Sequence, residues 1–342
     1  YNPDGDSNYT DGINITGDDF TVDGKGHTID GKNLSRIFNI VNATVTLKNI
    51  NFINGYADSG AAIFCEDSNL TIIGCNFSNN VVYGNDSSGG AIVFNGGDLV
   101  IADSKFSSNE AYNCGAVSVE SLTAEIRNTE FSENGAYDYG AMGVFGGNVL
   151  IDNCTFYNNY ANRSVAALSL YTNVTVNNTI FKGNRAKDFG ALFYENFNDD
   201  FLIIDYCQFT DNNCCAVYLH HYNAKILNSN FKNSVSEDGI AIYNGATNKL
   251  YLSNNTVNKY ESQIFSAYGG DITSSVTCVI FKNRTAYYHP NDTVEIYLHF
   301  YDDNDNLMQV QDFDLLVNNT KINHTFNISR SEERRVGKEC RS

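Results

Sequence analysis

The chain contains 342 residues, of which 42% are hydrophobic, enough apolar material for a large core. Its net charge is -18, from 40 acidic and 22 basic residues, so nucleic acid and anionic lipid are not expected partners. Two prolines, no tryptophan and 27 glycines indicate many short strands joined by turns. No apolar run approaches the roughly 18 residues that a membrane span requires.

The first 44 residues contain short apolar pulses between glycine and aspartate turns. Within them, residues 22–31 read VDGKGHTIDG, which predicts two strand ends separated by glycine turns. This run resembles the opening coils of pectate-lyase-like β-helices. We interpret His27 as a turn residue whose ring packs on the coil, rather than as a catalytic group.

A repeat with a period near 25 residues then organises the chain from residue 52 to residue 257. The spacing between repeats is 25, 29, 25, 25, 25, 28, 22 and 26 residues. The repeats are anchored by Phe52, Phe77, Phe106, Phe131, Phe156, Phe181, Phe209, Phe231 and Val257. A fixed period of this size predicts a solenoid of stacked units, in which the longer repeats loop out their extra polar residues.

Each coil alternates apolar and polar residues around a bend. In one coil, Val149 and Ile151 precede the bend at residues 152–153, and Cys154 and Phe156 follow it. Spacing by two on both sides predicts four inward side chains and excludes a helix. Consecutive coils should pair in parallel about 4.8 Å apart, so roughly ten coils would form a right-handed rod about 50 Å long.

An asparagine three residues after the phenylalanine recurs in six successive coils, at Asn80, Asn109, Asn134, Asn159, Asn184 and Asn212. We predict a structural ladder in which each amide donates to the side-chain carbonyl of the next coil. Asparagine also tolerates the left-handed backbone of a sharp bend. A Gly-Ala pair eight to nine residues after the phenylalanine, as at residues 115–116 and 140–141, predicts a tight corner.

Together these motifs resemble the repeat of adhesin-like, right-handed parallel β-helix proteins of methanogenic archaea, within the pectate-lyase-like superfamily. They are also similar to the repeats of polymorphic outer-membrane proteins. The resemblance covers residues 15–260. It implies an extracellular protein at the cell surface, without enzymatic activity or cofactor, which presents a repetitive face to a surface glycan or a cell-surface protein.

The pattern changes near residue 272. Residues 276–281, 294–301 and 313–317 alternate in a way that predicts antiparallel strands. We therefore divide the chain into a β-helix at 1–271, a partial immunoglobulin-like domain at 272–329 and a tail at 330–342. The tail carries five basic and three acidic residues and no aromatic residue. It resembles a translated sequencing adapter, and we expect it to be disordered and to pack on nothing.

The only polar clusters with catalytic promise lie in the two least regular coils: Asp199, Asp200, His220 and His221. Pectinases and polygalacturonases on this fold combine such groups with basic residues in one groove. The alternative to an adhesin is therefore a polysaccharide lyase or glycoside hydrolase. No Arg-x-Lys motif lies within the segment from Asp199 to His221, and an acidic chain is poorly suited to polyuronate, so we favour a non-catalytic protein.

Tyr83, Tyr112 and Tyr137 share the position six residues after the phenylalanine, which predicts either a strip that stacks against sugars or a spine that packs coil on coil. Cys75, Cys154 and Cys207 occupy an inward position in coils too far apart for disulfides, so free buried thiols are expected. A local bridge or metal site among Cys207, Cys214 and Cys215 stays open as an alternative.

No metal site is expected elsewhere. Residues 302–306, DDNDN, resemble a calcium loop but lack its glycine and its terminal glutamate, so a hairpin turn is favoured. Seventeen Asn-x-Ser/Thr sequons, such as those at Asn42, Asn69 and Asn173, offer N-glycosylation acceptors on the exposed turns of a surface protein. We expect a monomeric fragment of a larger protein.

Overall fold

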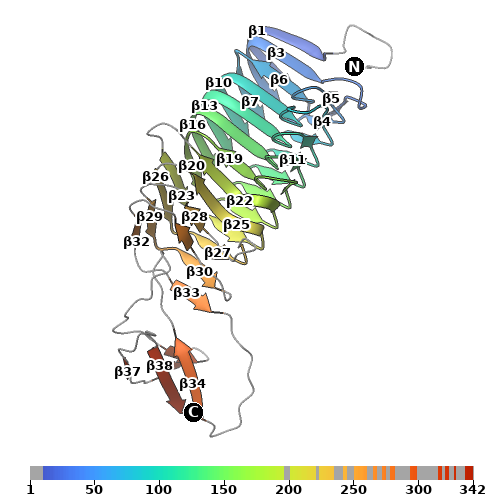
Figure 1. The fold of residues 1–342 in the computed structure, drawn as a ribbon. Helices are drawn as coiled ribbons and strands as arrows, with labels where there is room; N and C mark the ends of the chain where they lie inside the picture. Colours follow the sequence, from blue (N-terminus) through green and yellow to red (C-terminus); the bar gives the residue numbers. More distant parts are fainter. Residues whose placement is uncertain are drawn as a thin grey trace.

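The computed structural model describes residues 11–195, 201–220, 223–234, 242–244 and 250–259, and the strands that follow residue 264. Every element in these residues is a β-strand, and consecutive coils stack in chain order along one axis from β1 to β33 (Figure 1). The predicted parallel β-solenoid is confirmed. In the described part of the chain, no helix is present that could cross a membrane.

The phenylalanines of the repeat lie in one eleven-stranded sheet that receives one short strand from each coil. Its neighbours pair in parallel with phenylalanine opposite phenylalanine, as for Phe131 and Phe156. The strands are β2 (Thr28–Asp30), β4 (Asn51–Ile53), β8 (Asn76–Ser78), β11 (Lys105–Ser107), β14 (Glu130–Ser132), β17 (Thr155–Tyr157), β21 (Ile180–Lys182), β24 (Gln208–Thr210), β27 (Asn230–Lys232), β30 (Thr256–Lys259) and β33 (Cys278–Phe281).

The rest of each coil belongs to a twenty-two-stranded sheet. Its strands also pair in parallel with the coil before and the coil after, for example Ile101 with Ile126. The longer strands are β1 (Ile13–Asp23), β3 (Phe38–Lys48), β6 (Ile63–Glu66), β7 (Asn69–Ile73), β10 (Ile92–Ala102), β13 (Val117–Arg127), β16 (Met142–Asp152), β19 (Leu168–Leu170), β20 (Asn173–Asn177), β22 (Arg185–Glu195), β23 (Phe201–Asp205), β25 (Asn213–His220), β26 (Asn223–Leu227), β28 (Ile242–Asn244), β29 (Leu250–Ser253), β31 (Phe265–Ala267) and β32 (Ile272–Ser274).

The same sheet includes a row of two-residue strands. In each coil, the two-residue strand follows the short strand of the eleven-stranded sheet after one sharp bend. The last of the row, β18, pairs with the start of β22. These strands are β5 (Tyr56–Ala57), β9 (Val81–Val82), β12 (Glu110–Ala111), β15 (Gly135–Ala136) and β18 (Tyr160–Ala161).

The interior follows the predicted alternation. Val149, Ile151, Cys154 and Phe156 are all buried in one coil. The ring of Phe156 stacks on those of Phe131 and Phe181 with centroids 4.8 and 5.0 Å apart. Stacked aromatic rings at the repeat distance of the coils give the core both its apolar area and its register.

The asparagine ladder has the expected hydrogen bonds. The amide of Asn134 donates to Oδ1 of Asn159 and to the backbone carbonyl of Phe106, both at 3.0 Å. Its own Oδ1 accepts from the backbone and side chain of Asn109, at 3.1 and 2.9 Å. One expectation is wrong: the left-handed residue is not the ladder asparagine but its predecessor, such as Glu133 with φ of 58°. The bend thus precedes the amide and turns it inward.

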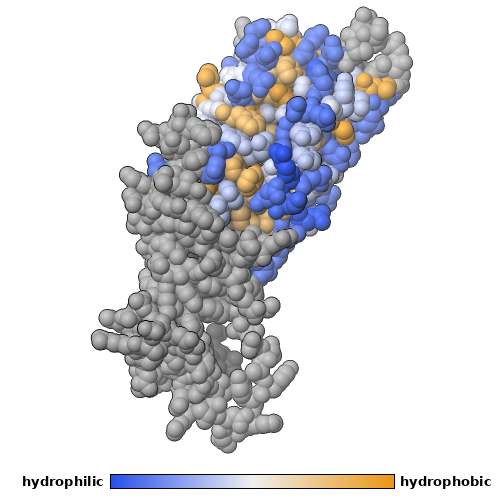
Figure 2. Space-filling view, in the orientation of Figure 1, coloured by the Kyte–Doolittle hydropathy of each residue, from blue (hydrophilic) through white to orange (hydrophobic). Residues whose placement is uncertain are grey.

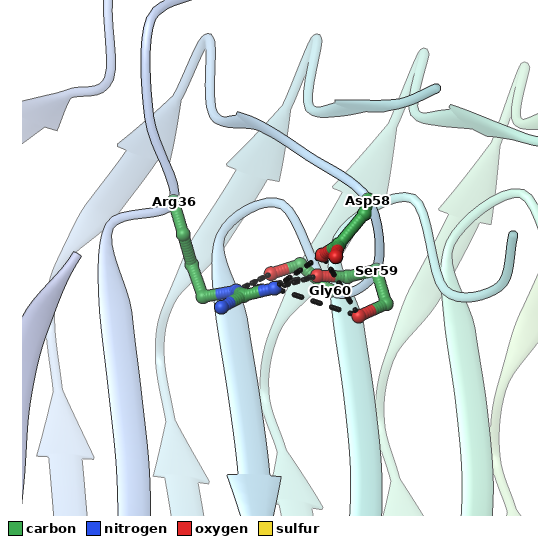
Figure 3. Close-up of polar contacts among 4 residues, drawn as sticks. All are labelled: Arg36, Asp58, Ser59 and Gly60. Carbon is green, nitrogen blue, oxygen red and sulfur yellow. Dashed lines mark hydrogen bonds and ion pairs between the residues drawn. The ribbon is translucent and has the colours of Figure 1, made fainter. Parts of the chain in front are cut away.

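The corners between strands are tight, as the Gly-Ala pairs predict. A Cβ on Gly140 would lie 1.9 Å from the carbonyl oxygen of Ala166 in the next coil. Nearer the N-terminus, Arg36 secures a corner instead (Figure 3): its Nη2 lies 2.8 Å from Oδ1 of Asp58 and 2.9 Å from the carbonyl oxygen of Ser59. Glycine lets coils approach, whereas Arg36 joins one coil to the next through charge-assisted hydrogen bonds.

Parallel pairing continues past residue 271. β32 pairs with β29 and β33 with β30, both in parallel, so the antiparallel strand expected at 276–281 is wrong. The reason is that Val279 keeps the register of Val257 and so extends the existing sheet edge.

Antiparallel pairing begins farther along the chain. β34 (Thr293–Leu298) and β37 (Asn327–Ile328) flank β38 (Val336–Arg341), and β35 (Leu315–Val317) pairs with β36 (Thr320–Ile322). The strands expected near 294–301 and 313–317 agree with this arrangement. The expectation that the tail packs on nothing is wrong, because residues 336–341 pair as a strand with β34 and β37. Residues 302–306 lie outside the described part.

Candidate ligand-binding groove

A shallow groove runs along the row of two-residue strands. Its first part, about 290 Å³, is lined by residues of β9, β12 and β15 together with Tyr112, Tyr137 and Tyr160. Its second part, about 620 Å³, continues from Tyr160 and Asn162 over Arg185, Lys187 and Asp188. Because both parts share Tyr160 and Asn162, they form one groove, which we call the coil groove. Figure 2 shows one face of the molecule, on which the described surface is mainly hydrophilic with separate hydrophobic patches.

The floor of the coil groove is small and apolar. Ala111, Ala136 and Ala161 occupy matching positions in successive coils, and their side chains point toward the interior. Side chains on either side of them point outward, because residues alternate between the two faces of a strand. The repeat therefore places a smooth floor beneath walls whose chemistry differs from coil to coil.

The predicted tyrosine strip divides into two stacked pairs. Tyr56 stacks on Tyr83, and Tyr112 stacks on Tyr137, each with ring centroids 4.9 Å apart. Within the described residues no ring contact joins Tyr83 to Tyr112, and the longer repeat between them separates the pairs. Since the rings face one another along the rod, their edges and hydroxyls, rather than their faces, are what a ligand would meet.

Tyr137 is held in place from the other side. The guanidinium of Arg163 lies over the Tyr137 ring, 5.4 Å from its centroid. Arg163 also contacts the buried Asp138 carboxylate through Nε and Nη2, at 2.6 and 2.7 Å. Ser164 donates a further hydrogen bond of 2.8 Å to the same carboxylate. This fork geometry fixes the tyrosine pair and the groove wall that it forms.

Tyr160 occupies the centre of the coil groove in a different way. A Cβ on Gly135 would lie 2.2 Å from Cζ, 2.3 Å from the hydroxyl oxygen and 2.6 Å from Cε1 of Tyr160. Only a Cβ position above the plane of the ring lies at all three of these distances. The Tyr160 ring therefore lies with one face against the glycine. Its hydroxyl donates to Oε1 of Glu110, two coils away, at 3.1 Å. The opposite ring face is therefore turned away from the sheet.

The electrostatics of this contact are consistent with a neutral phenol that donates. Burial, and then the nearby Glu110 carboxylate, raise the pKa of Tyr160 above its ordinary value. The phenol keeps its proton at neutral pH and its hydrogen bond to Glu110 persists. Tyr160 is the residue that sequence reasoning missed. A glycine preceding a tyrosine at the same repeat position in the next coil was the available signal.

The predicted catalytic residues are only partly placed. Asp199, Asp200 and His221 lie outside the described residues. His220 lies in β25, where its Nδ1 is 2.7 Å from Oε1 of Glu195 in the preceding coil. Near this pair, the Tyr171 hydroxyl is 3.1 Å from that of Tyr139, and burial raises the pKa of Tyr171 well above its usual range. A phenol so disposed is a poor proton acceptor at neutral pH.

The expectation of free, buried thiols is confirmed. Cys75, Cys154 and Cys207 are buried free thiols, and so are Cys214 and Cys215. Burial raises the pKa of Cys154 and of Cys207 to about 12, which makes both thiols poor nucleophiles. Over the described ranges, no group of three or more His, Cys, Asp and Glu residues is placed to hold a metal ion.

A family model described as the right handed beta helix region matches residues 109–231 and 146–286. The two overlapping matches together span more than half of the chain, so the protein belongs to the right-handed β-helix family. That fold fits the pectate-lyase-like superfamily, which includes both enzymes and non-enzymes. Neither a curated protein nor a solved structure matches the chain.

Proposed function

We propose that this protein is a non-catalytic, adhesin-like protein of an archaeal cell surface that binds an extended glycan along the coil groove. In this proposal the β-helix is a rigid stalk, followed by an immunoglobulin-like module, and exposed sequons carry N-linked glycans. The chain acts as a monomeric segment of a larger extracellular protein, and its partner is a glycan on a neighbouring cell.

One observation carries the proposal: the Tyr160 ring lies flat on Gly135 in the middle of a continuous groove. A ring with one face on the sheet and the other turned outward is a platform for the apolar face of a sugar. Tyr112 and Tyr137 line the same groove, and their hydroxyls offer hydrogen-bonding groups to a ligand beside that platform. The Asp138–Arg163 clamp limits the movement of the wall, which lowers the entropic cost of binding.

The test is a titration of the full chain against immobilised and soluble oligosaccharides, with Tyr160→Ala compared with Tyr157→Ala. Tyr157 is a matched control because it is 39% exposed but lies in the other sheet. We expect Tyr160→Ala to weaken glycan binding at least tenfold, as expected for an aromatic hot spot. Tyr157→Ala should leave affinity unchanged. Equal effects of the two substitutions would contradict the proposal.

The Glu195–His220 pair keeps a glycan-cleaving enzyme as the second candidate. If the protein were a lyase or hydrolase, this pair would be a natural acid–base unit. We expect no hydrolysis or elimination of pectin, polygalacturonate, alginate or peptidoglycan-type glycans by the purified chain. We also expect His220→Ala and Asp200→Ala to leave glycan binding unchanged. Turnover that either substitution abolishes would replace the adhesin proposal with the enzyme.

A further inference from the structure

The two ends of the coil groove differ in charge. At the N-terminal end, Glu110 lies beside Tyr112 and accepts a hydrogen bond from Tyr160. At the C-terminal end, Arg185 lies one coil after Tyr160 and pairs with it in register. Lys187 follows on the same strand as Arg185. Arg185 and Lys187 are both exposed, and Ala186 between them packs against the core. The alternation directs both cations outward.

These cations stand out on an acidic protein. The chain has a net charge of -18, and most of its described arginines are engaged: Arg36 with Asp58, Arg127 with Glu125 and Arg163 with Asp138. Across the described residues, neither Arg185 nor Lys187 forms an ion pair. Asp188 lines the same part of the groove, so the two cations outnumber the one carboxylate there.

We propose that the coil groove recognises a mixed glycan, in which a neutral sugar lies on Tyr160 and an adjacent sugar bearing a carboxylate or sulfate lies over Arg185 and Lys187. This inference rests on the proposed glycan binding and names the ligand class. An arginine fork pairs with either anion, and a lysine adds a mobile point charge. The groove therefore binds the chain in one direction only.

The same charges disfavour a glycan that carries a carboxylate on every unit. Such a chain would place one carboxylate near Glu110 when another lies over Arg185, because the two side chains belong to coils on opposite sides of Gly135 and Tyr160. Like charges brought together at a binding surface repel each other and so exclude such a ligand. A neutral homopolymer would use Tyr160 but leave both cations without an anion.

The experiment measures the affinity of the full chain for four oligosaccharides of equal length. Hyaluronan alternates neutral and carboxylated units, keratan sulfate with sulfate only on its N-acetylglucosamine alternates neutral and sulfated units, chitin is neutral, and polygalacturonate is charged on every unit. We expect the two alternating glycans to bind at least about five-fold tighter than the other two. The better of the alternating pair identifies the anion as carboxylate or sulfate.

The variants make the assignment specific. Arg185→Gln with Lys187→Gln should weaken binding of the alternating glycans about tenfold and leave chitin oligosaccharide binding unchanged. Lys182→Gln is the matched control, since this exposed lysine lies in the same coil but in β21. Asp188→Asn should strengthen binding of the alternating glycans about two-fold, because it removes the one carboxylate beside the two cations.

The inference is overturned if the double variant leaves every affinity unchanged, or if polygalacturonate binds as tightly as the alternating glycans. Chitin binding that depends on Tyr160 would in that case leave the proposed function standing. A chain that binds none of the four glycans overturns both.

Discussion

At one inward position the same residue recurs from coil to coil, whereas at the neighbouring outward position the residue differs. Three residues after each phenylalanine, six coils in succession place asparagine, and all six side chains are buried. Four residues after it, the outward position changes in every coil, through Val81, Glu110, Gly135, Tyr160, Arg185 and Asn213. Identity from coil to coil therefore builds the stack, whereas differences between coils create chemistry on its surface.

The largest effect is expected from the repeated core. Phe156→Ala should lower the free energy of unfolding by about 3–5 kcal/mol, because it removes a fully buried ring stacked on both neighbours. Chemical denaturation of the purified chain measures this loss. A change below about 1 kcal/mol would mean that the ring stack does not hold the coils.

The asparagine ladder should rank second. Asn134→Ala leaves the buried Phe106 carbonyl and the Asn109 backbone amide without their side-chain partner, so a loss of about 2–4 kcal/mol is expected. The control is Asn148→Ala, an exposed residue one coil away. If the two substitutions cost the same, the ladder is not a source of stability.

A smaller loss of stability is expected at alkaline pH, where the buried thiols of the core titrate. Because burial raises the pKa of Cys154 and Cys207 to about 12, the unfolded chain loses thiol protons near pH 9 while the folded chain keeps them. Stability from each thiol is complete below about pH 9 and falls as pH rises toward 12, by up to about 1.4 kcal/mol per pH unit. Denaturation curves recorded across this range give the slope.

Cys154→Thr is the matching substitution. Thr129 and Thr179 occupy the same position in the adjacent coils, and each donates 2.7 Å hydrogen bonds to the carbonyl two residues before it. Threonine at 154 should therefore change stability at pH 7 by less than about 1.5 kcal/mol and make the alkaline slope shallower. An unchanged slope would show that this thiol does not titrate on unfolding.

The smallest effect on stability, with a clear effect on binding, is expected from Gly135→Ala. The three atoms nearest the new methyl group all belong to the Tyr160 side chain, which can rotate away, so stability should change by about 0.5 kcal/mol or less. Glycan affinity should nevertheless fall several-fold, because the ring loses its seat. Gly146→Ala is the control, since its Cβ has no neighbour nearer than 3.6 Å. Unchanged affinity would remove Tyr160 from the site.

Sequence periodicity was sufficient for the core but not for the groove. The alternation around Phe156 and the spacing of the asparagines determine which side chains face inward, because a period of two has only two faces. Periodicity did not predict the position of the Tyr160 side chain, because its ring extends back over Gly135 toward Glu110, 50 positions earlier. The same limit applied at residues 276–281, where alternation predicted a strand correctly but not whether its partner would be parallel.

The most direct test of the account is a crystal structure of the full chain with the oligosaccharide that binds most tightly. We predict a neutral sugar ring stacked on the outward face of Tyr160, with the next unit's carboxylate or sulfate within hydrogen-bond distance of Arg185. A glycan bound to another face of the rod, or across the Glu195–His220 pair with Tyr160 unoccupied, would contradict the assignment of the coil groove as the binding site.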